Sequence, residues 1–157
     1  MTMAAGFDRR TFVIGAGAAA GAAAISATFP AGAVQAALPA GASVYSPLPR
    51  AVRVADRILV AGTAPIWPDG SVDPDPGAQA RRCIEIMLTA LAEAGGTARD
   101  VVRTRSFLTD AAHAEAVGIA HGEAFSEVRP ASTMVVVAGL LDPRWVVEME
   151  LEAVLGV

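Results

Sequence analysis

The chain has 157 residues, with 16 acidic and 12 basic side chains and a net charge of −4 at pH 7. Every basic residue is arginine, which excludes Schiff-base chemistry through a protein amine and with it pyridoxal enzymes and class I aldolases. Because no segment supplies the basic face that phosphates require, we expect no nucleic-acid partner.

Residues 1–36 are typical of a cleavable export signal. The segment Asp8-Arg9-Arg10-Thr11-Phe12-Val13 fits the twin-arginine pattern, and a Gly/Ala-rich stretch of moderate hydrophobicity follows it. Small residues after Pro30 allow cleavage near Ala36. We therefore predict export by the twin-arginine route to the periplasm or extracellular space, with only transient membrane contact. The alternatives are an uncleaved membrane anchor or an artefactual upstream start.

Residues 37–44 are predicted to be a linker and residues 45–157 a single domain. Removing one acid and two arginines with the signal leaves a net charge of −5. About 110 residues bury enough surface to fold without a metal or a disulfide.

The first half of this domain predicts a hairpin followed by a helix. Residues 51–54 and 58–61 form two short strand-like segments, and Gly62 follows as a point of close backbone approach. A helix is then expected to begin at Pro76, capped by Asp75, and to end at Gly95.

The second half predicts a strand, a helix and two more strands. Residues 101–108 alternate as a strand, and Asp110 is placed to cap the second helix. Residues 133–137 and 145–155 are rich in β-branched side chains. This order predicts an α+β fold in which two helices pack on one face of a mostly β sheet.

The other face of that sheet needs a cover of its own. The apolar run Met134-Val135-Val136-Val137 indicates burial on both faces, yet only two helices are available. We expect the opposite face to be apolar and covered by another copy of the protein.

Residue types alone do not define a reaction. Cys83 is the single cysteine, and His113 and His121 lie about 12 Å apart along a helix, too far to chelate one ion. His121 is predicted to be a hydrogen-bonded core histidine. Glu148, Glu150 and Glu152 alternate along the last strand and are interpreted as a solvated face unless something binds there.

The order of the motifs is more specific than any one of them. Together they resemble the RidA (reactive intermediate deaminase, YjgF-type) family over about residues 45–154. The motifs that carry the resemblance are Arg50-Ala51-Val52-Arg53-Val54, Val60-Ala61-Gly62-Thr63, Leu91-Ala92-Glu93-Ala94-Gly95, Phe107-Leu108-Thr109-Asp110, Pro130-Ala131-Ser132-Thr133 and Val147-Glu148-Met149-Glu150-Leu151-Glu152-Ala153.

This resemblance implies a chorismate-mutase-like fold assembled as a barrel-like homotrimer, with ligand clefts between subunits and no metal or organic cofactor. It also implies hydrolysis of the reactive enamines and imines of small 2-amino acids to 2-keto acids and ammonia. That chemistry needs a cation for the carboxylate, backbone donors near the reacting carbon, and a carboxylate that activates water.

The resemblance carries over to the site only in part. Gly62 matches the glycine whose backbone approaches the ligand, and Glu148 matches the acid that orients water. The arginine expected directly after Pro-Ala is replaced by Ser132, and Leu48 stands where a tyrosine is usual. A serine cannot form the bidentate, charge-assisted pair that arginine forms with a carboxylate.

Three functions therefore stay open. The protein is an imine or enamine hydrolase that uses Glu148 with Ser132 or Thr133, a trimeric binding protein without turnover, or a cyclase or dehydratase acting on an uncharged substrate. Arg129 is placed in the loop before Ser132, where it can reach a ligand.

Overall fold

The structure is a computed structural model that describes residues 11–13 and 50–156. Most of the predicted signal, the 37–44 linker and Leu48 lie outside the described residues, so those predictions stay as they are. No helix in the described ranges is long and apolar enough to cross a membrane.

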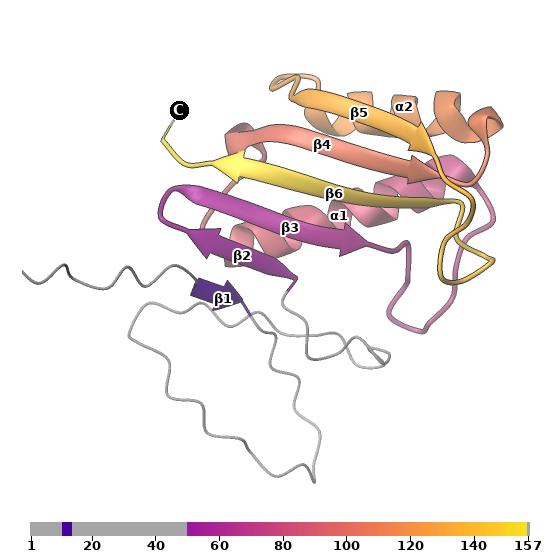
Figure 1. The fold of residues 1–157 in the computed structure, drawn as a ribbon, viewed down its shortest axis with the longest axis horizontal. Helices are drawn as coiled ribbons and strands as arrows, with labels where there is room; N and C mark the ends of the chain where they lie inside the picture. The colour runs from indigo at the N-terminus through magenta and orange to yellow at the C-terminus, as the bar shows by residue number, and fades with distance from the viewer. Residues whose placement is uncertain (1–10, 14–49, 157) are drawn as a thin grey trace, which may run out of the picture.

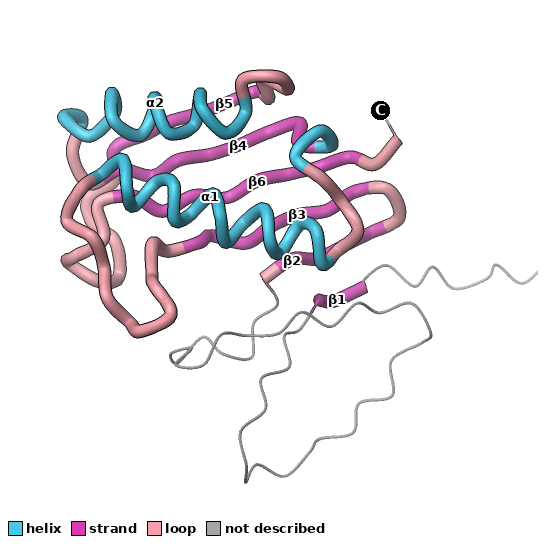
Figure 2. Tube along the Cα trace, turned by 180° about the vertical axis from the view of Figure 1, so that it is seen from behind, coloured by secondary structure: helices cyan, strands magenta, loops and turns pink. Residues whose placement is uncertain are grey.

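One mixed sheet forms the body of the fold, with the strands in the order β1-β2-β3-β6-β4-β5 (Figure 1). All neighbouring strands are antiparallel except β4 and β5, which are parallel. Both helices lie on the same face of this sheet (Figure 2), as the sequence predicts. The elements are β1 (Thr11–Val13), β2 (Ala51–Val54), β3 (Arg57–Thr63), α1 (Pro76–Glu93), β4 (Val101–Leu108), α2 (Ala114–Phe125), β5 (Ala131–Val136) and β6 (Val147–Val154).

The predicted start of the first helix is confirmed in atomic detail. Asp75 is its N-cap and accepts a hydrogen bond of 2.7 Å from the backbone N–H of Ala78. Pro76 occupies the first helical position, where a missing N–H costs nothing. The chain leaves the helix through Gly95, whose φ of 89° favours glycine.

The second helix begins later than Asp110 alone predicts. Asp110 caps a short 3₁₀ turn, Ala111–His113, by accepting a hydrogen bond of 2.8 Å from the N–H of Ala112. The α-helix α2 starts after that turn, at Ala114. The cap is therefore correct, but the tighter 3₁₀ geometry intervenes at the helix N-terminus.

The hydrophobic core lies between the sheet and the two helices. Along β6 every second residue is buried, and these residues are Val147, Met149, Leu151 and Ala153. From the helices, Met87 and Leu91 of α1 and Phe125 of α2 join the same cluster. Strand periodicity therefore assigns the alternate residues of β6, the glutamates, to the opposite face.

The prediction that this opposite face is apolar is wrong. Its centre carries Glu150 and Glu152 of β6, paired with Arg105 of β4 and Arg57 of β3. The expected burial of both sides of β5 is wrong within one chain as well, because Val135 and Val136 are 43% and 55% exposed. β5 is the edge strand and α2 does not cover it fully. The apolar run 134–137 predicted burial on both faces, but most of it lies in the edge strand β5, where side chains stay partly exposed.

Candidate functional site

Glu148 and Gly62 face each other across neighbouring strands. Between the pairs Val60–Leu151 and Thr63–Met149, β3 advances three residues while β6 advances two, which is a β-bulge. The bulge brings the backbone of Gly62 against the Glu148 carboxylate. A Cβ atom at Gly62 would overlap Oε1 of Glu148, so this close approach requires glycine.

Glu148 differs from the other two glutamates of its strand in what it contacts. Arg105 donates to Glu150 through Nη1 and to Glu152 through Nη2, the second at 3.2 Å. Arg57 also pairs with Glu152 at 3.2 Å. Within residues 50–156, Glu148 takes part in no ion pair. In β6, arginine side chains therefore neutralise Glu150 and Glu152, whereas the carboxylate of Glu148 has no arginine partner among the described residues.

The environment of Glu148 favours its protonated form more than water does. Burial of the half-buried side chain raises the pKa of Glu148, and the negative charge of Glu150 raises it further. A carboxyl group with a raised pKa is a better general base, because the acid and base forms lie closer in free energy at neutral pH. The sequence predicts a catalytic role for Glu148, and the direction of the pKa shift suits that role.

Cys83 lies buried on the helix-covered side of this site. Its Sγ donates a hydrogen bond of 3.1 Å to the carbonyl oxygen of Thr63, the residue after Gly62. Burial, with a smaller contribution from the charge of Glu148, raises the pKa of Cys83 far above its usual range. The thiol therefore stays protonated and supports the bulge; it is not a nucleophile.

Ser132 and Thr133 do not meet Glu148 within one chain. Ser132 pairs in register with Thr104, which is buried on the helix-covered face. Glu148 pairs with Phe107 on the opposite face. Thr133 does share the face of Glu148, but it lies two strands away and two residues out of register, at about 12 Å. A site that uses Glu148 together with Ser132 or Thr133 must take them from two chains.

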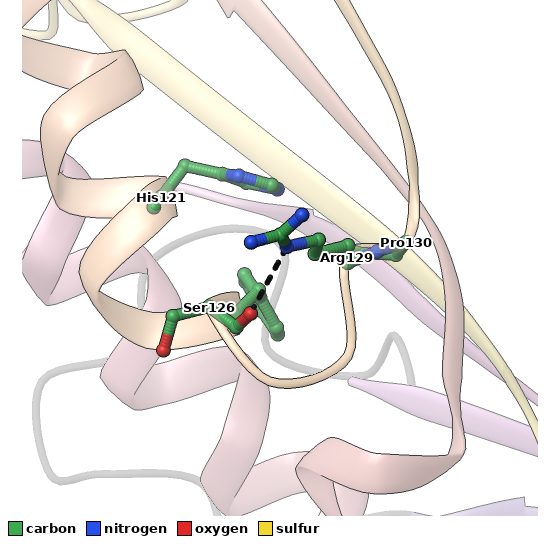
Figure 3. A pocket seen from close by; sticks show the side chains of 6 residues that line it. His121, Ser126, Arg129 and Pro130 are labelled. Carbon is green, nitrogen blue, oxygen red and sulfur yellow. Dashed lines mark hydrogen bonds between the residues drawn. The ribbon is translucent and has the colours of Figure 1, made fainter.

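Arg129 lies in the loop between α2 and β5, at a small cavity of about 380 Å³ (Figure 3). Its Nε donates to the carbonyl oxygen of Ser126 at 3.4 Å. His121 lines the same cavity, and its Nε2 lies 2.8 Å from Oγ1 of Thr104. The prediction of a hydrogen-bonded His121 is confirmed, although the ring is half-buried and reaches the cavity.

Two features of the site were not predicted from the sequence. The first is the pairing of Arg105 with Glu150 and Glu152, for which the matching alternation of Arg103, Arg105 and the three glutamates was a signal. Only the strand register shows which charges meet. The second is the bulge at Gly62, which an isolated glycine near the end of a strand suggests without locating its partner.

The Glu148–Gly62 pair can position and deprotonate a water molecule beside an exposed glycine backbone. Glu148 supplies the base, and the absence of a side chain at Gly62 leaves room for the Glu148 carboxylate to lie against the backbone. Within residues 50–156, no group of three or more His, Cys, Asp or Glu side chains is arranged to hold a metal ion.

Comparisons with known proteins agree with the fold and with the sequence resemblance. A family model described as Endoribonuclease L-PSP matches residues 35–155. The chain is 32% identical over 106 residues to the 3-aminoacrylate deaminase RutC of Acinetobacter baylyi, an alignment that covers 66% of this chain and 83% of that protein.

Two solved structures are also similar to this chain. The crystal structure of Rv2704 from Mycobacterium tuberculosis, a member of the YjgF/YER057c/UK114 family, has a TM-score of 0.69 at 31% identity and covers 93% of this chain and 99% of its own. Escherichia coli TdcF with bound serine has a TM-score of 0.64 at 25% identity, covering 69% of this chain and 87% of its own.

Proposed function

The chain belongs to the endoribonuclease L-PSP family, the RidA and YjgF proteins that its sequence resembles, and from that premise we propose that it hydrolyses small reactive imines or enamines. The products are a carbonyl compound and ammonia. The observation that carries this proposal is Glu148, which is held against Gly62 and is not neutralised by the arginines that pair with its two strand neighbours.

The proposed reaction needs one base and one water molecule. Glu148 takes a proton from water as the water oxygen attacks the imine carbon, and the C=N electron pair moves to nitrogen. Glu148 then returns the proton to that nitrogen, which gives a neutral carbinolamine. The carboxylate next takes the proton of the new hydroxyl group and passes it to the same nitrogen, so the C–N bond breaks, ammonia leaves and the C=O bond forms. A carboxyl group with a raised pKa suits both transfers, because it can accept and release a proton near neutral pH.

The names of the similar proteins support a small amino-compound as substrate. RutC of A. baylyi is named as a deaminase of 3-aminoacrylate, and TdcF of E. coli was solved with serine bound. Both molecules are short amino acids or their enamines. For this chain we propose a substrate of similar size, a short imine or enamine.

We propose no nuclease activity for this chain. Binding RNA requires arginine or lysine side chains arranged along a phosphate backbone, whereas this chain carries a net charge of −4. Arg57 and Arg105, which lie on the face of Glu148, are already paired with glutamates.

A homotrimer with clefts between subunits is part of the proposal. It is supported by the placement of Ser132 and Glu148 on opposite faces of one chain, which only a second chain can bring together. The exposed apolar residues of β5, Val135 and Val136, give such a contact a hydrophobic component. Light scattering of the purified protein should give three times the monomer mass, and a monomer at micromolar concentration would refute the assembly.

A binding protein without turnover is the second candidate, and one observation favours it. Ser132 replaces the cation that the resemblance places after Pro-Ala, so a carboxylate substrate loses a bidentate partner that contributes several kcal/mol. The same observation allows a cyclase or dehydratase that acts on an uncharged substrate.

An imine-trapping assay separates these functions. Imines of small 2-amino acids, generated in the presence of semicarbazide, are offered to the wild-type protein and to Ser132→Arg. Turnover by both, faster in the variant for carboxylate substrates, supports the hydrolase. Activity in the variant alone shows a binding protein whose cleft lacks the arginine needed to hold a carboxylate substrate. Activity in neither contradicts the proposed reaction.

We also propose export by the twin-arginine route, with cleavage near Ala36. The support is the Arg9-Arg10 pair and the small residues that follow Pro30. Replacing both arginines with lysine keeps the charge but removes the pair that the export receptor reads, so the protein should stay in the cytoplasm. Cell fractionation that finds unchanged export would refute this route.

A further inference from the structure

A cavity at the C-terminal end of α2 has the composition of a small-anion site. It has a volume of about 380 Å³, within the range of small-ligand sites, and is lined by His121, Gly122, Phe125, Ser126, Arg129 and Pro130. Figure 3 shows His121 and Arg129 reaching into the same space from α2 and from the loop before β5. None of these side chains belongs to the Glu148–Gly62 site, which opens on the other face of the sheet.

The backbone at Arg129 is strained in a way that presents its side chain. Its φ is 51°, in the left-handed region that glycine occupies freely and that costs a residue with a Cβ about 1 kcal/mol or more. Its N–H donates to the carbonyl of Phe125 at 2.9 Å, which closes the end of the helix. A non-glycine residue that keeps such a conformation is a candidate for a functional role.

The guanidinium of Arg129 is available to a ligand. Only its Nε has a partner, the carbonyl oxygen of Ser126, and no acid within residues 50–156 forms an ion pair with it. The nearby acid Glu127 pairs instead with Arg99, at 3.8 Å. The two Nη groups therefore keep the planar donor fork that suits a carboxylate.

The rest of the cavity provides a fixed polar group and apolar walls. His121 is anchored by its contact with Thr104 Oγ1, and its ring lies 4.9 Å from that of Phe125, tilted by 45°. Phe125 and Pro130 can contact a short carbon chain. The helix C-terminus carries about half a negative charge, but its last carbonyls already accept from Val128 and Arg129, so the full positive charge of Arg129 dominates.

From this arrangement we propose that the His121–Arg129 cavity binds a small monocarboxylate with a short carbon chain, such as a 2-oxo acid. Arg129 forms a bidentate pair with the carboxylate, and the ring nitrogen of His121 that is not engaged by Thr104 interacts with a second polar atom of the ligand. A single arginine matches a monoanion better than a phosphate dianion, which would need further cations. Within one chain this cavity lies on the helix-covered side of the sheet, apart from the Glu148–Gly62 pair, and binding there does not require turnover.

Titration of the purified protein with pyruvate, followed by calorimetry or ¹H–¹⁵N NMR, tests the proposal. Pyruvate should bind with shifts centred on residues 121–130, and pyruvamide, which has the same skeleton without the charge, should bind about tenfold more weakly or worse. Arg129→Gln should weaken pyruvate binding by about tenfold to a hundredfold, and Arg129→Lys by less, because lysine keeps the charge without the fork.

Three controls keep the result interpretable. Arg99→Gln removes one exposed positive charge that pairs with Glu127 beside the cavity, and it should leave pyruvate affinity nearly unchanged. Arg129→Gly relieves the backbone strain and should fold while losing pyruvate. Glu148→Gln should bind pyruvate here as well as the wild type does, whether or not the protein is a hydrolase. Equal binding of pyruvamide, or pyruvate binding unaffected by Arg129→Gln, would overturn the proposal.

Discussion

The two faces of the central strand β6 differ in almost every property, although their residues alternate along one segment. Val147, Met149, Leu151 and Ala153 are buried under the helices with exposed fractions of 2% or less. Glu148, Glu150 and Glu152 occupy the other face and are half-buried among charged neighbours. One face therefore supplies the free energy of folding, and the other is available for chemistry.

The three glutamates of the charged face also differ from one another in their partners. Arg105 and Arg57 neutralise Glu150 and Glu152, and such partly exposed pairs contribute little to stability. With both arginines engaged in these pairs, Glu148 is the single carboxylate of β6 that faces a glycine instead of an arginine. Mutations on the two faces should thus affect stability and activity separately.

The largest effect is expected on the helix-covered face. Met149→Ala should lower the free energy of unfolding by about 2–5 kcal/mol, because Met149 is fully buried and its removal leaves a cavity. Urea denaturation measures this loss. Turnover per folded molecule should change little at a temperature where the variant remains folded. A large loss of turnover in fully folded Met149→Ala would show that the two faces are not independent.

On the opposite face, Gly62→Ala should have the reverse effect, a large loss of turnover with little loss of stability. The new Cβ would overlap Oε1 of Glu148, and the flexible carboxylate must move away. Turnover should fall by about 10²-fold because the base leaves its position, while the melting temperature changes by only a few degrees. Gly118→Ala in α2 is the matched control, since nothing lies within 4 Å of its Cβ position. Equal activity in the two variants would refute the role of the bulge.

A buried polar contact on the covered face gives a smaller effect. His121→Phe keeps an aromatic ring against Phe125 but removes the partner of Thr104, whose side chain is fully buried. We expect the free energy of unfolding to fall by about 1–3 kcal/mol, the cost of an unsatisfied buried hydroxyl. The double variant His121→Phe, Thr104→Val should recover most of the loss. If it does not, the contact contributes nothing specific.

The smallest effect concerns the stability of Glu148→Gln as pH changes. Because burial raises the pKa of Glu148 above its unfolded value of about 4.3, the folded protein holds the proton more tightly than the unfolded chain does. The stabilisation is complete below the unfolded pKa and is lost as pH rises through the folded pKa. Glutamine mimics the protonated form, so the variant should melt slightly higher than the wild type at pH 7.

Thermal denaturation between pH 3.5 and 8 measures this difference, which should vanish below about pH 4. A variant that is less stable than the wild type at pH 7 would show that ionised Glu148 is stabilised in the fold.

Most of the fold could be predicted from the sequence because its signals are local. Asp75 and Pro76 define a helix start whatever surrounds them, and the alternation at 101–108 and 147–154 defines strands with two unlike faces. The order of the elements and the packing of both helices on one face follow from those signals and are confirmed.

The site was less predictable because it depends on register. The sequence places Glu148, Glu150 and Glu152 on one face, but only the pairing of β4 with β6 sets Arg105 against two of them. The same register directs Ser132 to the face opposite Glu148, which the motif Pro-Ala-Ser-Thr does not indicate. The expectation of an apolar face failed for this reason, since it was taken from β5 alone.

The proposed function depends on Glu148 as the base of an imine or enamine hydrolase. Its most direct test is kcat/KM for semicarbazide-trapped imine hydrolysis in Glu148→Gln and in Glu152→Gln, which changes the same residue type on the same face of β6. Glu148→Gln should lose about 10²-fold or more while keeping its oligomeric state, and Glu152→Gln should stay within a few-fold of the wild type. Equal rates for Glu148→Gln and the wild type would contradict the claim.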